Sequence, residues 1–244
     1  MHELLRQTAH RPIPLPAKPW IMVQTWHDLL FAHWALPPEQ IRRLVPAQLE
    51  LDLHEGKAYV AVTPFHMSGI RARFLPPLPG LSHFPELNVR TYVRYNNIPG
   101  VCFFSLDAGS RLAVKAARRS YGLPYLHAQM SVSIGEKIGY LSHRLESPGP
   151  AEFRGRYWPV SPPRQREKNS LEYFLTERYC LYVVRGGRVH RAYIHHVPWP
   201  LQDAQAEIEL NTMAKAAGIE LPAAKPLLHF SRMIEVLIWP LAKA

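Results

Sequence analysis

The sequence predicts an α+β chain that is mostly β, with antiparallel strands. Short apolar or alternating runs follow one another, and turn pairs such as Asn96-Asn97 and Gly186-Gly187 separate several of them. Runs that alternate with turns rather than with long helices favour hairpins, and hence an antiparallel sheet. The 24 prolines are spread between the apolar runs, which is typical of many short elements joined by stiff turns.

Strands are expected where apolar or alternating runs are bounded by turn residues. Residues 59–65 are apolar on both faces, so this strand is expected to be buried on both sides. A proline-rich loop over residues 75–85 is expected to lie over one end of the sheet. About ten strands result, at residues 20–34 (one strand or two), 49–53, 57–65, 86–95, 101–106, 125–134, 138–145, 154–160, 180–184, 189–197 and 229–238.

Helices are expected where a start signal precedes a suitable run. Pro38 stands in the first turn of one helix, and Ser110 is a good N-cap for another that Gly122 ends. Asn169-Ser170-Leu171-Glu172 has the form of a capping box. The expected helices cover residues 38–45, 111–120, the segment from this box through residue 177, and residues 203–217.

Two of the expected strands gather polar groups on one face. Since successive side chains of a strand point to opposite faces, one face of each is polar and the other apolar. The polar faces are Glu86, Asn88, Arg90, Tyr92 and Arg94 on the first, and Tyr125, His127, Gln129, Ser131 and Ser133 on the second. Such faces are either turned to water or enclosed in a barrel. Asn, Tyr, His and Gln outnumber Lys and Glu here, which favours a ligand pocket.

Composition limits the classes of protein and of partner. The 244 residues fit one domain, expected over residues 20–244 with an extended arm at residues 1–19. Cys102 and Cys180 stand in apolar surroundings and are expected to be buried free thiols in the cytoplasm. Neither a secretory signal nor a membrane-spanning run is evident. The formal charge of +10 is scattered, so nucleic acid is not expected as a partner.

Other reactive patterns have simpler explanations. Lys115 shares a helix face with Arg111, Arg118 and Arg119, so we expect a solvated basic face there rather than a nucleophile. The adjacent pair His195-His196 cannot chelate one ion from a regular strand. The sequence has no zinc spacing, phosphate-binding loop or nucleophile elbow, and we expect no metal and no cofactor.

Five blocks together resemble the YqjF-like family of uncharacterised bacterial proteins, over nearly the whole chain from residue 20. That family is distantly similar to acetoacetate decarboxylase. The resemblance implies a closed antiparallel β-barrel of the acetoacetate decarboxylase-like type, with a few outer helices and a polar lumen. The blocks are FAHWALPPEQIRRLVPAQLELD, LPGLSHFPELNVRTYVRY, RLAVKAARRSYGLPYLHA, SLEYFLTERY and HHVPWPLQDAQAEI.

The resemblance also indicates which chemistry is missing. In acetoacetate decarboxylase a Gly-Phe-Pro-Lys-Lys segment supplies the Schiff-base lysine and its neighbour, and the matching residues here are Gly122-Leu123-Pro124-Tyr125-Leu126. Both lysines are replaced, so imine-based decarboxylation is not expected. The catalytic glutamate of that enzyme corresponds to Glu86. The substrate-binding arginine of that enzyme corresponds to Ala35 or Trp34 here, so this binding residue is missing as well.

The resulting hypothesis is a small-molecule site for an anionic or carbonyl-bearing metabolite. Catalysis is assigned to Glu86, Tyr125 and His127, with Glu86 or His127 moving a proton and Tyr125 donating a hydrogen bond. Substrate binding is assigned to Arg90, Arg94, Asn88 and Gln129. The alternatives are a non-catalytic ligand-sensing module and a protein-interaction module on the same barrel. The sequence leaves open whether the chain is an enzyme and whether it forms a homo-oligomer.

Overall fold

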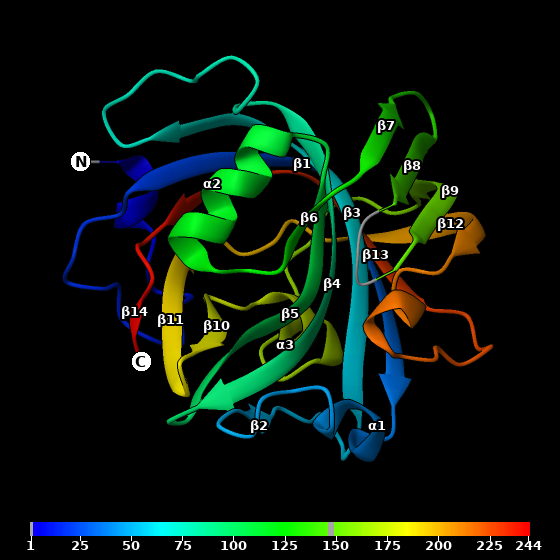
Figure 1. The fold of residues 1–244 in the computed structure, drawn as a ribbon, viewed down its shortest axis with the longest axis horizontal. Coiled ribbons are helices and arrows are strands. Elements are labelled where there is room, and N and C mark those ends of the chain that lie inside the picture. The colour runs from blue at the N-terminus through cyan, green and yellow to red at the C-terminus, as the bar shows by residue number, and fades with distance from the viewer. Residues whose placement is uncertain (1, 146–148) are drawn as a thin grey trace.

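Strands predominate in the computed structural model of the chain, which describes residues 2–145 and 149–244 (Figure 1). The helices are α1 (Pro38–Arg42), α2 (Arg111–Tyr121) and α3 (Leu171–Thr176), with short 3-10 turns at Glu3–Arg6 and Lys215–Ala217. The strands are β1 (Met22–Leu36), β2 (Glu50–Leu51), β3 (Ala58–Ala72), β4 (Phe84–Tyr95), β5 (Ile98–Ala108), β6 (Tyr125–His127), β7 (Gln129–Ser133), β8 (Ile138–Arg144), β9 (Ala151–Pro159), β10 (Cys180–Arg185), β11 (Arg188–His195), β12 (Gln202–Asn211), β13 (Leu227–Ile238) and β14 (Ala242–Lys243). The mostly β, α+β fold is as predicted.

The strands form one extended sheet in the order β14-β11-β10-β5-β4-β3-β1-β13-β12-β9-β8-β7. A further pairing of β11 with β13 joins two distant members of this order. Hydrogen bonds therefore run in a ring through β11, β10, β5, β4, β3, β1 and β13. Two pairings in the described chain are parallel, β5 with β10 and β5 with β6, so the expectation of a purely antiparallel sheet is wrong there.

The long strands β4, β3 and β1 lie next to one another in the wall of the ring. Residues 59–65 of β3 are all buried, which confirms the prediction from their apolar pattern. The expected strand at residues 20–34 is the single strand β1, which pairs with β3 on one side and β13 on the other. Because β1 lies between two strands, its backbone groups are hydrogen-bonded along both edges.

The β4–β5 hairpin sets the register of the polar strand face. Asn96 and Asn97 both have positive φ, 50° and 60°, as the predicted tight turn requires. The register places Glu86 opposite Ala108 and Asn88 opposite Leu106. Between Val89 and Arg90 the pairing shifts by one residue, because a bulge interrupts the ladder.

Helix α2 lies over one end of the ring (Figure 1). The Ser110 side chain accepts a hydrogen bond from the Ala113 N–H, and Gly122 ends the helix with φ 59°, as predicted. The expected basic face is exposed, Lys115 included. Val114 and Tyr121 of this helix are buried, whereas Leu112 is 60% exposed.

The helix predicted over residues 203–217 is wrong, because residues 202–211 form β12. Its side chains alternate, with Ala204, Ala206 and Ile208 half-buried and Gln205 and Glu207 exposed. Strand β12 pairs with β9 in antiparallel register. This pairing is a tertiary interaction, which the helix propensity of the segment does not take into account. Only a single 3-10 turn, Lys215–Ala217, remains helical.

The strand predicted over residues 125–134 is broken at Ala128. Its first part, β6, pairs with β5, whereas β7 turns away to pair with β8. The Ala128 N–H donates to the Ala108 carbonyl at this break. The two parts therefore follow different neighbours, and the predicted common face of Tyr125, His127 and Gln129 is lost.

Other predicted bounds differ by a few residues. Helix α1 ends at Arg42 instead of residue 45, and only Glu50–Leu51 of residues 49–53 is a strand. Helix α3 follows its predicted start, since the Ser170 side chain accepts from the Tyr173 N–H. Cys102 and Cys180 are buried free thiols, as predicted.

The N-terminal end of the chain lies against the ring. Leu4, Leu5 and Leu15 pack against Val23 and Leu237.

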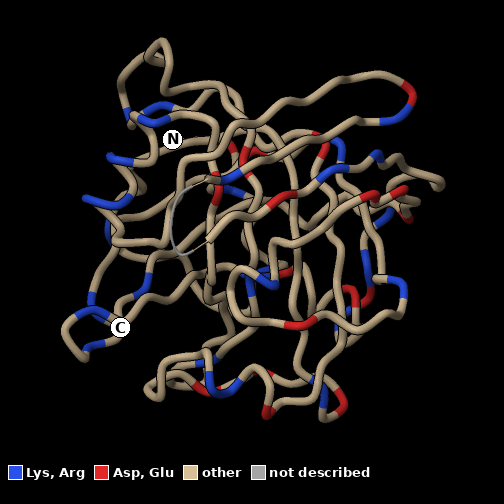
Figure 2. Tube along the Cα trace, turned by 45° about the vertical axis from the view of Figure 1, so that its right-hand side comes forward, with Lys and Arg blue, Asp and Glu red and all other residues tan. Residues whose placement is uncertain are grey.

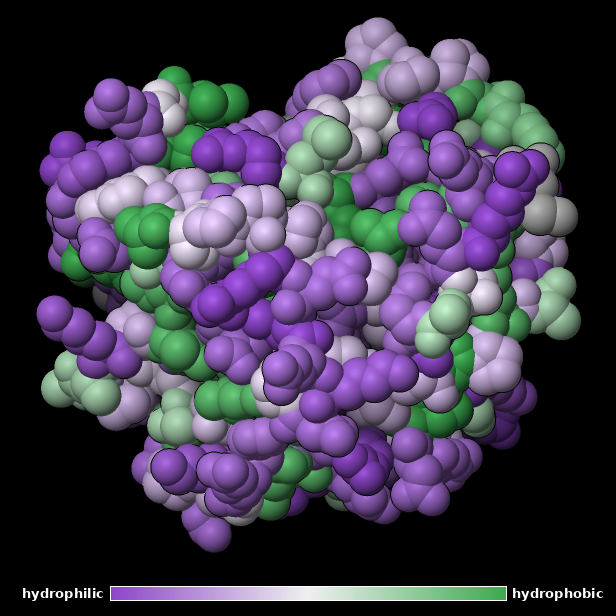
Figure 3. Space-filling view, turned by 180° about the vertical axis from the view of Figure 1, so that it is seen from behind, coloured by the Kyte–Doolittle hydropathy of each residue, from purple (hydrophilic) through white to green (hydrophobic). Residues whose placement is uncertain are grey.

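The surface carries charge of both signs. In the view of Figure 2, Lys and Arg mark the left edge of the trace, whereas Asp and Glu lie toward its centre and right. The face opposite to that of Figure 1 is mostly hydrophilic, with hydrophobic side chains in separate areas (Figure 3). Within the described residues, no helix is long and apolar enough to cross a membrane.

Candidate functional site

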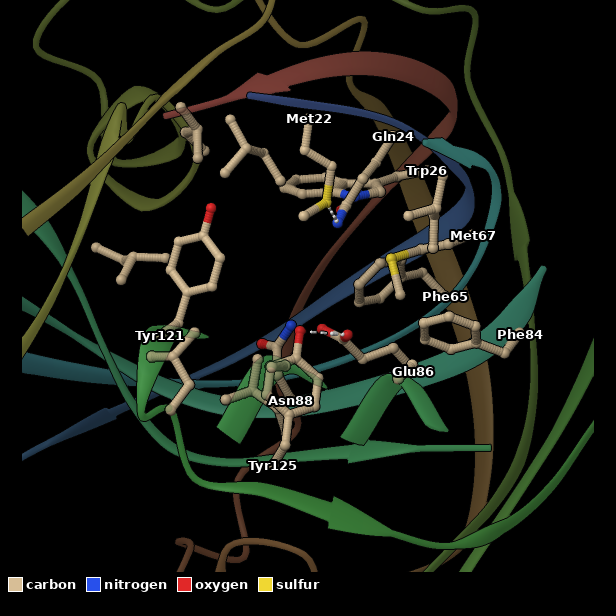
Figure 4. Close-up of a pocket in the computed structure, with 18 of the residues that line it drawn as sticks. Met22, Gln24, Trp26, Phe65, Met67, Phe84, Glu86, Asn88, Tyr121 and Tyr125 are labelled. Atoms are coloured by element: carbon tan, nitrogen blue, oxygen red, sulfur yellow. Dashed lines mark hydrogen bonds between the residues drawn. The ribbon is translucent and has the colours of Figure 1, made fainter. Parts of the chain in front are cut away.

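A cavity of about 290 Å³ is lined by residues from every strand of the ring and from α2. Most of its wall is apolar, which differs from the polar lumen that the resemblance implies. Trp26, Phe65, Met67 and Phe84 surround the carboxyl group of Glu86 in Figure 4. A largely apolar wall with a few placed polar groups is the usual form of a small-molecule site.

Glu86 is the acidic group of this cavity. It lies on β4 and is 4% exposed. The Tyr125 hydroxyl donates a hydrogen bond of 2.9 Å to Glu86 Oε2 (Figure 4). Burial raises the pKa of Glu86 from 4.5 to about 7, because the charged form loses its hydration; the Tyr125 and Asn88 side chains oppose this rise. The carboxyl group can therefore gain or lose a proton near neutral pH.

Tyr125 reaches Glu86 because α2 carries the chain back to the same sheet. After the helix, β6 pairs in parallel with β5, with Tyr125 beside Leu106. Burial raises the pKa of Tyr125 well above 10, and the nearby Glu86 adds to this rise. The phenol is thus a hydrogen-bond donor over the whole range in which Glu86 titrates.

The backbone of Glu86 is fixed from a neighbouring strand. The Tyr140 hydroxyl, from β8, lies 2.7 Å from the Glu86 carbonyl oxygen and 2.9 Å from that of Phe65. This phenol is itself buried and has one proton, which the two oxygens share. The position of the carboxyl group is therefore set by β3, β4 and β8 together.

Arg90 is the buried arginine of the cavity that has no acidic partner among the described residues. Its side chain is 8% exposed, and none of the described carboxylates lies within 4.0 Å of it. The guanidinium lies over the rings of Phe31 and Tyr92, at 5.3 and 6.0 Å from their centroids. Among the residues that the structure describes, its Nε has no hydrogen-bond partner, and the same holds for Thr63 Oγ1 and Asn88 Oδ1. Buried cations are normally paired, so this group favours an anionic ligand.

Two other arginines line the cavity, Arg71 and Arg178. Arg71 is half-buried and its side chain donates to the Gly69 carbonyl, whereas Arg178 is paired with a carboxylate. Arg178 donates to Asp52 Oδ2 at 2.5 Å, and both side chains are buried. Arg94 donates to the second oxygen of the same carboxylate at 2.6 Å and is 42% exposed. Arg94 is not among the residues that line the cavity, which removes it from the expected binding set.

The structure thus brings together four of the seven predicted site residues. Glu86, Asn88, Arg90 and Tyr125 line one cavity, and their roles stay predictions. His127, Gln129 and Arg94 do not line it. Gln129 lies on β7, which leaves the ring after Ala128, and Arg94 lies at the end of β4 that pairs with β2. The sequence reasoning missed Trp26, Phe65, Met67 and Trp199 as cavity residues, although the aromatic content of residues 20–34 was a signal.

Two kinds of chemistry find little support in the described chain. None of the residues that line the cavity is a lysine, and Lys115 points to solvent on the outer face of α2. Among the described residues, no group of three or more His, Cys, Asp or Glu side chains is arranged to hold a metal ion.

Comparison with known proteins agrees with the fold and with the resemblance. Residues 23–235 match the model of a family described as "Uncharacterized conserved protein", DUF2071. The chain is 49% identical over 232 residues to the "Uncharacterized protein YqjF" of Bacillus subtilis, covering 95% of this chain and 96% of that protein.

Solved structures show the same fold at low sequence identity. An acetoacetate decarboxylase from Legionella pneumophila has a TM-score of 0.64 and 14% identity, covering 96% of this chain and 92% of that one. The enduracididine biosynthesis enzyme MppR complexed with pyruvate has a TM-score of 0.62 and 9% identity, covering 97% of each chain. Such likeness shows the fold alone.

Proposed function

The chain belongs to the DUF2071 family, and from that premise we propose that it binds a small organic acid and transfers a proton on it. Arg90 holds the carboxylate of the ligand, and Glu86 acts as the acid–base group beside a carbonyl, with Tyr125 as the hydrogen-bond donor. The ring of strands is in this view a closed barrel whose lumen is the cavity. We also propose that residues 20–244 are one domain, that residues 1–19 form an arm on it, and that the protein works in the cytoplasm.

One observation carries this proposal: a buried carboxyl group is hydrogen-bonded to a buried phenol inside an apolar cavity. Glu86 and Tyr125 are 2.9 Å apart, and the pKa of Glu86 is raised to about 7 by burial. A general base works best when its pKa is close to the working pH. A pair of this kind in a pocket is a candidate catalytic site.

The proton step uses these two groups in turn. The Glu86 carboxylate takes a proton from a C–H bond next to the ligand carbonyl. The electron pair of that bond forms a carbon–carbon double bond, and the π pair of the carbonyl moves onto its oxygen. The protonated Glu86 no longer needs the phenol as a donor, so Tyr125 can donate to the enolate oxygen. Return of the proton from Glu86 to carbon restores the ketone.

Arg90 supports an acid as the ligand. A guanidinium can donate two parallel hydrogen bonds to a carboxylate, and it is a permanent cation. Related folds bind small acids: one solved structure of MppR carries pyruvate, and another carries the buffer HEPES. No lysine lines the cavity in the described chain, so a Schiff base with the ligand is not part of this proposal.

The proposal is tested with keto acids whose carbonyl lies at increasing distance from the carboxylate. 4-Oxopentanoate, 5-oxohexanoate, 6-oxoheptanoate and 7-oxooctanoate are incubated with the protein in D₂O. Exchange of the hydrogens next to the ketone is followed by NMR, and binding by calorimetry. We expect catalysed exchange with at least one probe, with a rate that rises with pH as Glu86 ionises.

Three variants separate binding from proton transfer. Glu86→Gln should bind the probe without catalysing exchange. Arg90→Met should weaken binding by about tenfold or more, because a charged hydrogen bond contributes about 1.5–3 kcal/mol. Arg94→Met, on the same strand but outside the cavity, is the matched control and should change neither. Binding without exchange would leave a non-catalytic sensing module, and absence of binding by every acid would overturn the proposal.

A further inference from the structure

The cavity reaches the protein surface at one end only of its described wall. Six lining residues are exposed: Ala72, Leu75, Pro76, Leu78, Ala116 and Ser120. All of them belong either to the segment that follows β3 or to α2. At the other end, Arg90, Thr176, Arg178 and His196 are buried. The mouth of the cavity is therefore the gap between α2 and residues 72–78.

Both sides of this mouth carry apolar side chains, and Arg71 beside Ala72 and Ser120 on α2 are its polar members. Ala113 and Ala117, one turn apart on α2, are half-buried and line the cavity. Leu75 and Leu78 line it from the facing segment. The Ser110 hydroxyl donates to the Gly80 carbonyl at 2.8 Å, which links the start of α2 to that segment. Small side chains on the helix leave room for a chain of carbon atoms to pass.

Apolar surface continues outside the mouth. Phe74 is 89% exposed and Leu112 is 60% exposed, and they lie on the two segments that form the gap. Leu75 and Leu78 are themselves more than half exposed. Exposed apolar side chains grouped around a pocket mark a place for an apolar part of a partner.

Of the polar groups that β4 places in the cavity, Arg90 lies farthest from this mouth. The residues that line the cavity are, from mouth to interior, Phe84, Glu86, Asn88 and Arg90. Six residues of a strand span about 20 Å, so a molecule as short as pyruvate cannot contact both Arg90 and the mouth. The carboxylate site is at the closed end, and the apolar surface leads outward from it.

We infer that the ligand is an amphipathic carboxylic acid whose head group lies at Arg90 and whose aliphatic tail leaves between α2 and residues 72–78. This inference rests on the proposed function, since it assumes that Arg90 holds a carboxylate. It adds the class of acid: a linear chain longer than that of pyruvate or acetoacetate. The α2 face of Ala113 and Ala117 then determines which tails fit.

The test is a chain-length series of saturated acids: butanoate, hexanoate, octanoate and decanoate. Binding is measured by calorimetry, with the fluorescence of Trp26 and Trp199 in the cavity as a second signal. Each buried methylene contributes about 0.8 kcal/mol, so affinity should rise about three- to fourfold per carbon until the tail reaches water. Ala117→Phe should weaken octanoate and decanoate strongly but leave butanoate unchanged.

Controls distinguish the tail path from other causes. Lys115→Phe adds the same ring on the solvent face of α2 and should have no effect. Leu78→Asp, on the facing segment, should repeat the loss for long acids if Ala117→Phe does not fold. Arg90→Met should weaken every acid, whereas a loss confined to Arg71→Met would place the head group at the mouth and overturn the inference.

The outcomes for the two proposals differ. If the acids bind with the same affinity at every length, the tail path is wrong while the carboxylate site at Arg90 stands. If the long acids gain affinity and Ala117→Phe removes that gain, the inference is supported. If no acid of any length binds, the proposed function fails and the inference fails with it.

Discussion

Replacing Glu86 by glutamine tests the desolvation of this carboxyl group, on which the proposed chemistry depends. In the folded protein its pKa is about 7, whereas the ordinary value is 4.5. Between these two values the folded state keeps a proton that the unfolded state has lost. The unfolded state then binds fewer protons, so the free energy of unfolding falls as the pH rises.

The size of this loss follows from the shift. A difference of about 2.5 pKa units at about 1.4 kcal/mol per unit gives about 3 kcal/mol. The cost is absent below the unfolded pKa and fully present above the folded pKa. Glutamine carries no proton to lose, so the Glu86→Gln variant escapes it. The free energy of unfolding of the variant, relative to that of the natural protein, should therefore increase by about 3 kcal/mol as the pH rises from about 4.5 to 8.

The assay is urea unfolding followed by tryptophan fluorescence, at several pH values in this range. Any change in the hydrogen bond from Tyr125 affects the free energy of unfolding of the variant at low and at high pH alike. It therefore cancels when the values at the two pH extremes are subtracted. Glu220→Gln, at an exposed glutamate, is the control and should follow the natural protein at every pH. Parallel curves for Glu86→Gln and the natural protein would refute the reasoning, because they would mean that burial does not raise this pKa.

Three further predictions concern the groups around the site. Arg144→Met should lower the free energy of unfolding by about 3–5 kcal/mol, because it leaves Asp107 buried without its cation, 2.9 Å away; urea unfolding of the double variant with Asp107→Leu should recover most of this loss. Tyr140→Phe should cost about 1–3 kcal/mol in the same assay, since the Glu86 and Phe65 carbonyl oxygens both lose a donor; no change would mean that these oxygens are solvated. Borohydride treatment with 4-oxopentanoate should leave the mass of the protein unchanged, and a covalent adduct would contradict the absence of a cavity lysine.

The alternating pattern of β4 was sufficient to predict its strand and its turn. Period-two alternation in residues 86–95 and the Asn96-Asn97 pair determine a hairpin almost independently of the rest of the fold. The resemblance to a known family added the wider architecture. It also pointed to Glu86 and to the loss of both lysines, which no local pattern contains.

Strand β12 shows where local preference misleads. Ala, Gln, Glu and Leu in residues 204–210 are all good helix formers, so the propensity indicates a helix. The same residues also alternate, and β9 supplies a partner for that alternation: Arg156 donates to Glu207 at 2.9 Å across the pair. The neighbour strand decides between the two readings, and its position is not local information.

The cavity itself could not be predicted from one strand at a time. Its wall joins residues as distant in sequence as Met22, Arg90 and Trp199. Their proximity comes from the ring of pairings, and in particular from the contact between β11 and β13. The aromatic segment at residues 20–34 was visible, but nothing in it shows that Trp26 faces Glu86 rather than solvent.

Arg90 and Arg94 show most directly that alternation along a strand does not determine which side chains line the cavity. They are four residues apart on one strand, so period two places them on the same face. The register with β5 is continuous from Arg90 to Arg94, but β2 pairs with the end of β4 beside Arg94. Arg94 there meets Asp52, whose second oxygen binds Arg178, so this single carboxylate is shared by two arginines. The charge available to a ligand thus depends on where Asp52 lies, and a substitution of Asp52 by asparagine should leave Arg178, in the cavity wall, without its carboxylate partner.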